Sequence, residues 1–202
     1  MKTIAGVYVS PFIRMQLGMR SIHVKGGSRD NFLGVPHYTS SIQRKYIYRY
    51  GVGLYISHYF ALEFAYTSLG HYTTDFYIKT IVGDATGTAN RKLSAYDVLA
   101  YGYIPMRRWC FYIGAGPTFI KSQYAPVLMG FDGMRVAYDL GGAYHSGFVR
   151  PKAVLGVGYH LCNNIVLSVN YSRIFHFGRT LPQDVTWYVP TIDVISVGVT
   201  AV

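Results

Sequence analysis

The chain is 202 residues long, which predicts a single domain over residues 1–202. Half of the residues are hydrophobic and only 14% are charged, against roughly 25% in ordinary soluble domains, so much of the outer surface is not expected to face water. The net charge is +10, but Lys and Arg form no run longer than two and no recognition helix is predicted, which argues against a nucleic-acid partner. No apolar run of about 18 residues is present, so no transmembrane helix is expected.

Large apolar residues alternate with small or polar ones along most of the chain, and this period of two predicts β-strands. In residues 51–56, for example, three bulky apolar side chains alternate with Gly51, Gly53 and Tyr55. The predicted strands cover about residues 5–18, 45–57, 60–69, 92–104, 109–121, 149–161, 164–175 and 188–201.

The connections between these strands alternate between short and long. Three are short turns, at residues 57–59, 105–108 and 162–163. The other four are long polar segments, at about residues 19–44, 70–91, 122–148 and 176–187. In an up-and-down antiparallel sheet, this pattern places all the short turns and both termini at one end and all the long segments at the other.

Antiparallel strands of this kind are expected to close into a barrel, because closure removes exposed edges. The bulky face points inward in a soluble ligand-binding barrel and outward in a membrane barrel. The small face is rich in Gly and Ala and poor in Lys and Glu, so it would be a poor surface toward water. An eight-stranded barrel is also only just wide enough to be filled by side chains, and Tyr and Trp lie toward strand ends, as in membrane-interface girdles. We therefore predict a membrane barrel with its bulky face toward lipid.

A family resemblance is carried by residues 50–70 (YGVGLYISHYFALEFAYTSLG), 100–119, 152–175 and 195–202 (ISVGVTAV). In their Gly-rich strands, tight turns and aromatic strand ends, these segments resemble the transmembrane domain of the OmpA/OmpX class of small outer-membrane barrels. The resemblance implies an all-β, eight-stranded antiparallel up-and-down transmembrane β-barrel with three short periplasmic turns and four long extracellular loops. It also implies location in the bacterial outer membrane, termini in the periplasm, and the barrel-assembly machinery as a partner. That machinery usually recognises a terminal aromatic residue, whereas this chain ends in Ala201-Val202.

Five charged residues fall on the small face that should point into the barrel: Arg14, Arg49, Glu63, Asp97 and Lys152. Charges inside a narrow barrel have to be paired, because unpaired burial costs several kcal/mol. Two interpretations are open for this set. It is either a salt-bridged plug that makes the lumen rigid or a gate whose rearrangement opens a small pore.

Cys110 and Cys162 are the two cysteines of the chain, one near the start of a predicted strand and one just past the end of its neighbour. By phase both should point inward at the periplasmic end, and the periplasm is oxidising. We therefore predict a disulfide between them; the alternative is two unpaired buried thiols.

No metal, cofactor or catalytic site is predicted. The seven His residues are scattered and show neither HxH nor HExxH spacing. His145-Ser146 resembles only a fragment of the His-x-Ser arrangement of lipid A deacylases, with no acid placed to orient the base. The Gly-rich segments 26–28 and 83–88 are interpreted as flexible loop tips, not as phosphate cradles.

The functional prediction is thus a non-enzymatic outer-membrane protein with a structural or surface-interaction role, whose loops bind other molecules or mediate adhesion. The expected partners are outer-membrane lipids and lipopolysaccharide, whose phosphates suit the positive charge of the loops, and host or cell-surface molecules. A narrow low-conductance pore is the alternative hypothesis, and a lipid-modifying outer-membrane enzyme is the third.

Overall fold

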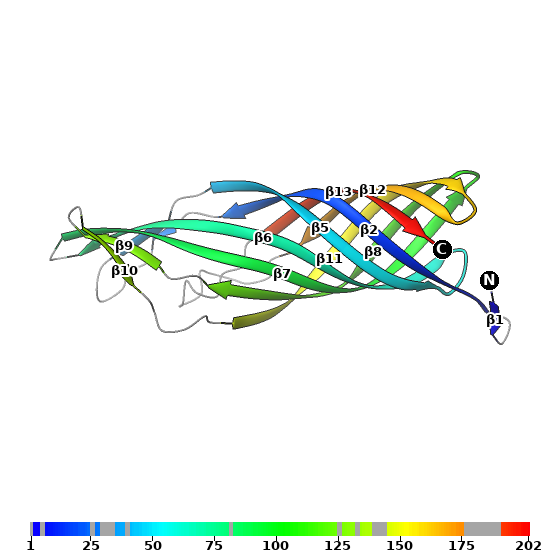
Figure 1. The fold of residues 1–202 in the computed structure, drawn as a ribbon, viewed down its shortest axis with the longest axis horizontal. Helices are drawn as coiled ribbons and strands as arrows, with labels where there is room; N and C mark the ends of the chain where they lie inside the picture. The colour runs from blue at the N-terminus through cyan, green and yellow to red at the C-terminus, as the bar shows by residue number, and fades with distance from the viewer. Residues whose placement is uncertain are drawn as a thin grey trace.

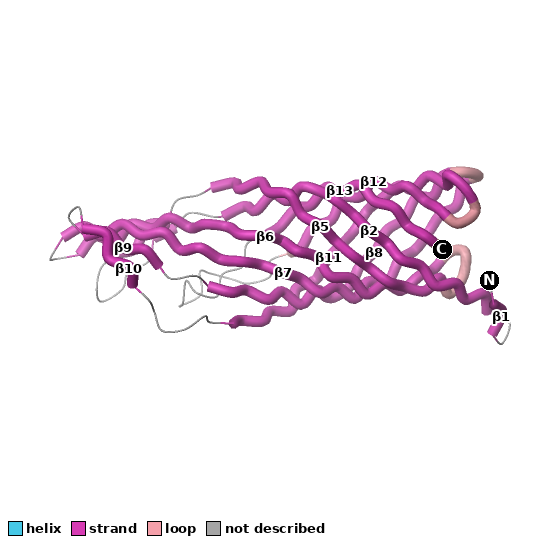
Figure 2. The backbone as a smooth tube through the Cα atoms, viewed as in Figure 1, coloured by secondary structure: helices cyan, strands magenta, loops and turns pink. Residues whose placement is uncertain are grey.

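The computed structural model consists of β-strands joined by turns (Figures 1 and 2). It describes residues 2–4, 7–24, 27–28, 35–38, 41–80, 83–124, 127–131, 134–138, 145–175 and 191–202. Among these residues there is no helix long and apolar enough to cross a membrane.

Eight of the described strands form a closed antiparallel ring, because β13 pairs back onto β2 (Figure 1). They are β2 (Val7–Val24), β5 (Ser41–Tyr55), β6 (Phe60–Thr80), β7 (Gly83–Met106), β8 (Trp109–Tyr124), β11 (His145–Cys162), β12 (Ile165–Ile174) and β13 (Thr191–Ala201). Each pairs with the ring strands that precede and follow it in the chain. The up-and-down barrel predicted from the alternation is therefore confirmed.

The two ends of the barrel differ. The tight turns between β5 and β6, β7 and β8, and β11 and β12 lie at one end, which we call the turn end, together with β1 (Lys2–Ile4) and Val202 (Figure 1). At the opposite end, which we call the hairpin end, several strands run far past the ring. Both termini thus lie at the same end as the short turns, as the connection pattern predicts.

Beyond the hairpin end the sheet continues into four further strands: β3 (Gly27–Ser28), β4 (Val35–Tyr38), β9 (Val127–Phe131) and β10 (Met134–Tyr138). Their order with the long strands is β10-β9-β7-β6-β4-β3, so three hairpins join into one antiparallel sheet, which we call the platform. The prediction of flexible tips is wrong here, because residues 83–88 begin β7 and Gly27–Ser28 form β3. Glycines in these segments pair with residues of a neighbouring strand, as Gly87 does with Phe76. A Gly-rich pattern indicates a loop because glycine is depleted in strands, and it does not reveal a pairing partner elsewhere in the chain.

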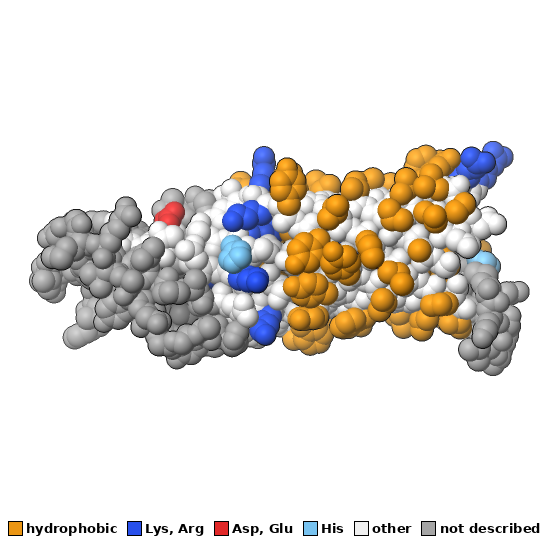
Figure 3. All heavy atoms as spheres, in the orientation of Figure 1, with side chains coloured by type: hydrophobic (Ala, Val, Ile, Leu, Met, Phe, Trp, Pro, Cys, Tyr) orange, Lys and Arg blue, Asp and Glu red, His pale blue; other side chains and the backbone are white. Residues whose placement is uncertain are grey.

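The two faces of the barrel wall have the predicted orientation. Along β12, exposed and buried side chains alternate at every residue. Large apolar side chains face outward and are well exposed, such as Leu17 at 68% and Ile113 at 64%. Figure 3 shows them as a broad band of apolar side chains on the face in view. Exposed apolar residues occur on all eight ring strands, and we call this band the apolar belt. A surface of this kind is suited to the hydrocarbon core of a bilayer.

The small inward residues let the strands and lumen side chains approach closely. A Cβ added at Gly51 would collide with the Glu63 carboxylate, and one added at Gly116 would collide with the Val98 carbonyl oxygen. Glycine is therefore required by space at Gly116, where the obstacle is backbone, whereas a Cβ at Gly51 would displace the Glu63 side chain.

Candidate functional site

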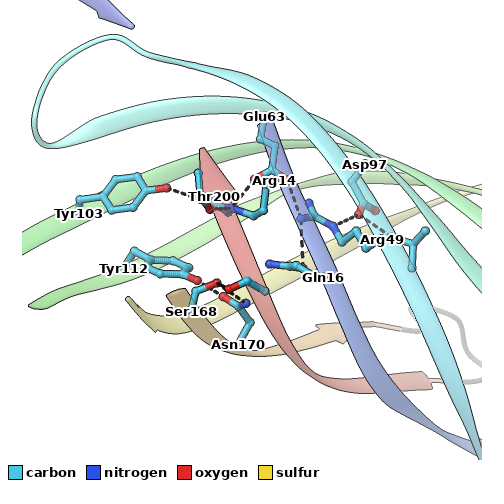
Figure 4. A network of polar contacts seen from close by, with 12 residues as sticks. Arg14, Gln16, Arg49, Glu63, Asp97, Tyr103, Tyr112, Ser168, Asn170 and Thr200 are labelled. Carbon is cyan, nitrogen blue, oxygen red and sulfur yellow. Dashed lines mark hydrogen bonds and ion pairs between the residues drawn. The ribbon is translucent and has the colours of Figure 1, made fainter. Parts of the chain in front are cut away.

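The five predicted lumen charges lie inside the barrel and are joined by ion pairs. Figure 4 shows Arg14, Arg49, Glu63 and Asp97 of this set. Glu63 on β6 forms ion pairs with Arg14 Nη1 at 2.7 Å and with Arg49 Nη1 at 2.5 Å. Asp97 on β7 accepts Lys152 Nζ at 2.6 Å and Arg49 Nε at 3.3 Å. The exposed fractions of these five side chains lie between 0% and 6%. Arg49 bridges both carboxylates, so the five residues form one chain of charges, which we call the lumen network.

Hydrogen bonds extend the lumen network to other strands. Arg14 donates from Nε to Thr200 Oγ1 on β13 and from Nη2 to Tyr103 Oη on β7, each at 3.0 Å. Thr118 Oγ1 on β8 donates to Asp97 Oδ1 at 2.8 Å. With Arg14 on β2, Arg49 on β5, Glu63 on β6 and Lys152 on β11, the network ties together strands from every side of the ring.

Two apolar clusters fill the lumen on either side of these charges. The turn-end cluster contains Phe12, Ala61, Leu99, Tyr101, Tyr103, Cys110, Tyr112, Val154 and Val166. The hairpin-end cluster contains Ile22, Ile47, Leu69, Tyr72, Leu93, Ala95, Ile120, Ile174, Ile192 and Val194. The Arg14 guanidinium also lies within 5.5 Å of the Phe12, Tyr101 and Tyr112 ring centroids, which favours a cation over the aromatic faces. The lumen is therefore a layered, filled core.

Two further buried arginines lie near the hairpin end and were not among the predicted lumen charges. Arg20 has no exposed surface, and one of its nitrogens donates to the His71 carbonyl oxygen at 2.5 Å. Arg91 is 4% exposed and donates to Tyr72 Oη at 3.0 Å. Arg20 is six residues from Arg14 on β2, so the alternation places both on the inward face. It was missed because the predicted strand ended at residue 18.

Comparison with known proteins gives a consistent picture of the fold. No family model matches the chain. An uncharacterized protein of Coxiella burnetii is 26% identical over 214 residues, covering 94% of this chain and 83% of that protein. Among solved structures, Neisserial surface protein A matches with a TM-score of 0.59 at 13% identity, covering 96% of this chain and 98% of that one.

Two further solved structures come from Pseudomonas aeruginosa. The N-terminal β-barrel domain of OprF matches with a TM-score of 0.51 at 9% identity over 95% of this chain and 96% of that one. The outer membrane protein OprG matches with a TM-score of 0.51 at 14% identity over 94% of each chain. The chain has the fold of the small outer-membrane β-barrels. The resemblance to the OmpA/OmpX class is therefore confirmed for the fold, and together with the apolar belt it supports location in the bacterial outer membrane.

The predicted disulfide is not present in the structure. Both cysteines are free: Cys110 is buried in the turn-end cluster and Cys162 is exposed. The pairing of β11 with β12 shifts register between His160 and Cys162. This irregularity breaks the alternation on which the inward placement of Cys162 depended, so the two thiols do not face one another.

The described residues contain no cluster suited to a metal ion. No group of three or more His, Cys, Asp or Glu side chains that could hold a metal ion occurs in that part of the chain. The main chain of His145 and Ser146 lies in β11, where these residues pair with Gln123 and Ser122, but their side chains lie outside the described set.

Proposed function

We propose that the chain is an integral outer-membrane protein whose filled barrel anchors a surface-interaction platform on the outside of the cell. The observation that supports this is the length of the β6–β7 hairpin. β7 has 24 residues and β6 has 21. At about 3.3 Å per residue β7 is about 80 Å long, whereas a tilted strand needs only about 9–11 residues to cross the hydrocarbon core. More than half of this hairpin therefore serves no purpose in spanning the membrane.

The platform is suited to contact with other molecules because it is an ordered sheet. Three hairpins that are separate in sequence pair with one another, so β4 and β9 support β6 and β7 from both sides. A supported sheet presents a fixed surface and loses less entropy on binding than separate loops do. In this proposal the turn end and both termini face the periplasm, and the partners are host, neighbouring-cell or lipopolysaccharide groups beyond the outer leaflet.

The alternative, a narrow pore, requires the lumen to open. Two carboxylates hold three cations there, and apolar clusters fill the space on both sides of them. Removing one partner of such a buried pair costs about 3–5 kcal/mol, and the apolar clusters would also have to separate. The gate interpretation of the lumen network therefore has less support than the plug interpretation.

Orientation is tested first, by epitope insertion in intact cells. One variant carries the epitope between Thr80 and Gly83 at the end of the β6–β7 hairpin, and a second carries it after Asn163 at the turn end. The proposal expects antibody to label the first variant on intact cells and the second only after the outer membrane is opened. The reverse pattern would contradict it.

Function is tested by shortening the platform without disturbing the barrel. Asp75 pairs with Thr88, so replacing residues 76–87 by Asn-Gly keeps the register below the new turn. Attachment of cells bearing this variant to cultured host cells should fall at least tenfold. Deletion of residues 176–187, of nearly equal length, is the matched control and should leave attachment unchanged. Full attachment by cells whose barrel folds normally but lacks both the 76–87 and 127–138 segments would refute the proposed role.

A further inference from the structure

Basic side chains gather on the outer face just beyond the hairpin-end edge of the apolar belt (Figure 3). Arg44 on β5, His71 on β6, Lys92 on β7 and Lys121 on β8 are all exposed and lie on consecutive strands of the ring. His71 pairs directly with Lys92, and Lys121 pairs with Ser94, two residues from Lys92 on the same face. We call these four residues the basic row.

The backbone of β6 is shaped to bring His71 into this row. The pairing of β6 with β7 shifts register between Ser68 and Gly70, and Gly70 has a φ of 71°. A positive φ of this kind is readily adopted by glycine and is typical of a β-bulge. Because of the bulge, His71 faces outward and Tyr72 faces the lumen. Gln43 binds the backbone of Thr73, accepting from its amide at 3.0 Å, which holds Arg44 alongside this stretch of β6.

An aromatic row lies directly below the basic row on the same four strands. Tyr48 and Tyr66 have ring centroids 6.4 Å apart, and Tyr66 and Tyr96 have centroids 5.3 Å apart. Tyr96 pairs in turn with Phe119 on β8. Below these rings the outward side chains are apolar or aromatic, such as Val98, Phe64 and Tyr50. This wall thus passes from cations through aromatic rings to apolar side chains. The order matches that of an anionic lipid, which presents phosphate groups, then the interfacial region, then acyl chains.

The opposite wall differs in its charge. There Arg173 Nε contacts Asp193 Oδ1 at 2.7 Å, and His23 Nε2 contacts Asp193 Oδ2 at 3.1 Å. Within the described residues no ion pair is formed by any member of the basic row. The described acid on the same face, Asp75, lies four residues beyond His71 on β6, about 13 Å away, and accepts a hydrogen bond from Thr88. No acidic side chain in the described part of the chain therefore neutralises the positive charge of the basic row, which is available to an external anion.

We propose that the basic row binds the phosphate groups of a phosphorylated glycolipid of the outer leaflet, whose acyl chains lie against the β5–β8 wall. Neighbouring strands are about 4.8 Å apart, so four strands make a row about 14 Å wide. This width exceeds the size of a single phosphate and suits a head group that carries two. The site lies on the barrel wall and not on the platform. That it faces the outer leaflet rests on the orientation proposed above. Binding of the glycolipid to purified protein does not depend on that orientation.

The test uses purified protein in nanodiscs and two probes, bisphosphorylated lipid A and the same lipid after removal of both phosphates. One variant carries Arg44→Ser, Lys92→Ser and Lys121→Ser. The matched control carries Arg107→Asn, Arg108→Ser and Arg173→Ser, which removes the same charge from exposed positions elsewhere. Folding of each protein is checked by the electrophoretic shift between boiled and unboiled samples.

Each basic residue near an anionic lipid strengthens binding about fivefold, so the basic-row variant should bind bisphosphorylated lipid A about a hundredfold more weakly than wild type. The control variant should bind it within about threefold of wild type, and the dephosphorylated lipid should bind all three proteins weakly. If the basic-row variant does not fold, Lys92→Gln and Lys121→Gln should each weaken binding about fivefold. Equal binding by basic-row and control variants, or equal binding of both probes to wild type, would overturn the proposal while leaving the platform's role intact.

Discussion

The most direct test of the lumen network is to neutralise Asp97. This carboxylate receives Lys152 Nζ at 2.6 Å, Thr118 Oγ1 at 2.8 Å and Arg49 Nε at 3.3 Å, and it has no exposed surface. Asp97→Asn keeps the shape and removes the charge. Arg49 retains Glu63 at 2.5 Å, but Lys152 is left without a carboxylate in a closed lumen. Leaving one charge of a buried pair without its partner costs about 3–5 kcal/mol, so the free energy of unfolding should fall by that amount.

Lys152→Met separates charge pairing from packing. In that variant Asp97 keeps Arg49 and Thr118, so the expected loss is about 2 kcal/mol, the value of one charged hydrogen bond. In the double variant neither member of the pair is left alone, and the total loss should be about 3 kcal/mol rather than the sum of the two single losses. The coupling energy between Asp97 and Lys152 is therefore expected to be about 2–4 kcal/mol.

The measurement is reversible unfolding in urea, with the barrel in lipid vesicles and followed by tryptophan fluorescence. Ser122→Ala is the control, because Ser122 is buried in the same lumen and its Oγ has no hydrogen-bond partner in the described structure. It should change stability by less than about 0.5 kcal/mol. Simple additivity of Asp97→Asn and Lys152→Met would refute the argument, since it would mean that the two side chains stabilise the barrel independently.

Three further predictions follow from the lumen. Glu63→Ala should leave single-channel conductance at the background level, because the apolar clusters still fill the lumen; a steady rise in conductance would favour the gate. In native, unreduced protein a thiol reagent should label Cys162 alone, and after denaturation it should label Cys110 as well; no labelling after denaturation would show a disulfide. Gly116→Ala should sharply reduce the yield of folded barrel in the electrophoretic shift assay, whereas Gly102→Ala, whose Cβ would meet nothing within 4 Å, should not; equal yields would contradict the close approach of β7 and β8.

The barrel was predictable because its signal repeats on every strand. The choice of the outward face depended on residues such as Gly51 and Gly53, which would form a poor surface toward water. In the structure these glycines lie on the same, inward face of the wall as Arg49 and Glu63. A period of two assigns the face of each residue from its neighbours alone. For this reason the five charges of the lumen network could be placed inside the barrel without knowledge of the pairing partners.

What could not be predicted depends on pairing between distant segments or on breaks in the period. The platform exists because residues 128–131 pair with 85–88 and residues 35–38 pair with 76–79, which no local pattern reveals. The register shift before Cys162 reversed the expected direction of its side chain. The bulge at Gly70 likewise changes the parity of β6, so that simple alternation would have put His71 in the lumen.

Strand length and surface composition differ around the barrel, and this difference connects the two proposals. The wall formed by β5–β8 carries the basic row, the aromatic row and the long strands of the platform, whereas β12 and β13 have only 10 and 11 residues. His71 and Lys92 lie on the same two strands that continue into the platform, only a few residues below the point where Gln43 holds Thr73. A lipid head group bound at the basic row would therefore contact the base of the β6–β7 hairpin and restrain its tilt relative to the membrane. Removing the basic row should then lower platform-dependent attachment by a modest factor even when the platform itself is intact, and attachment equal to that of the Arg107, Arg108 and Arg173 control variant would show that the two sites act independently.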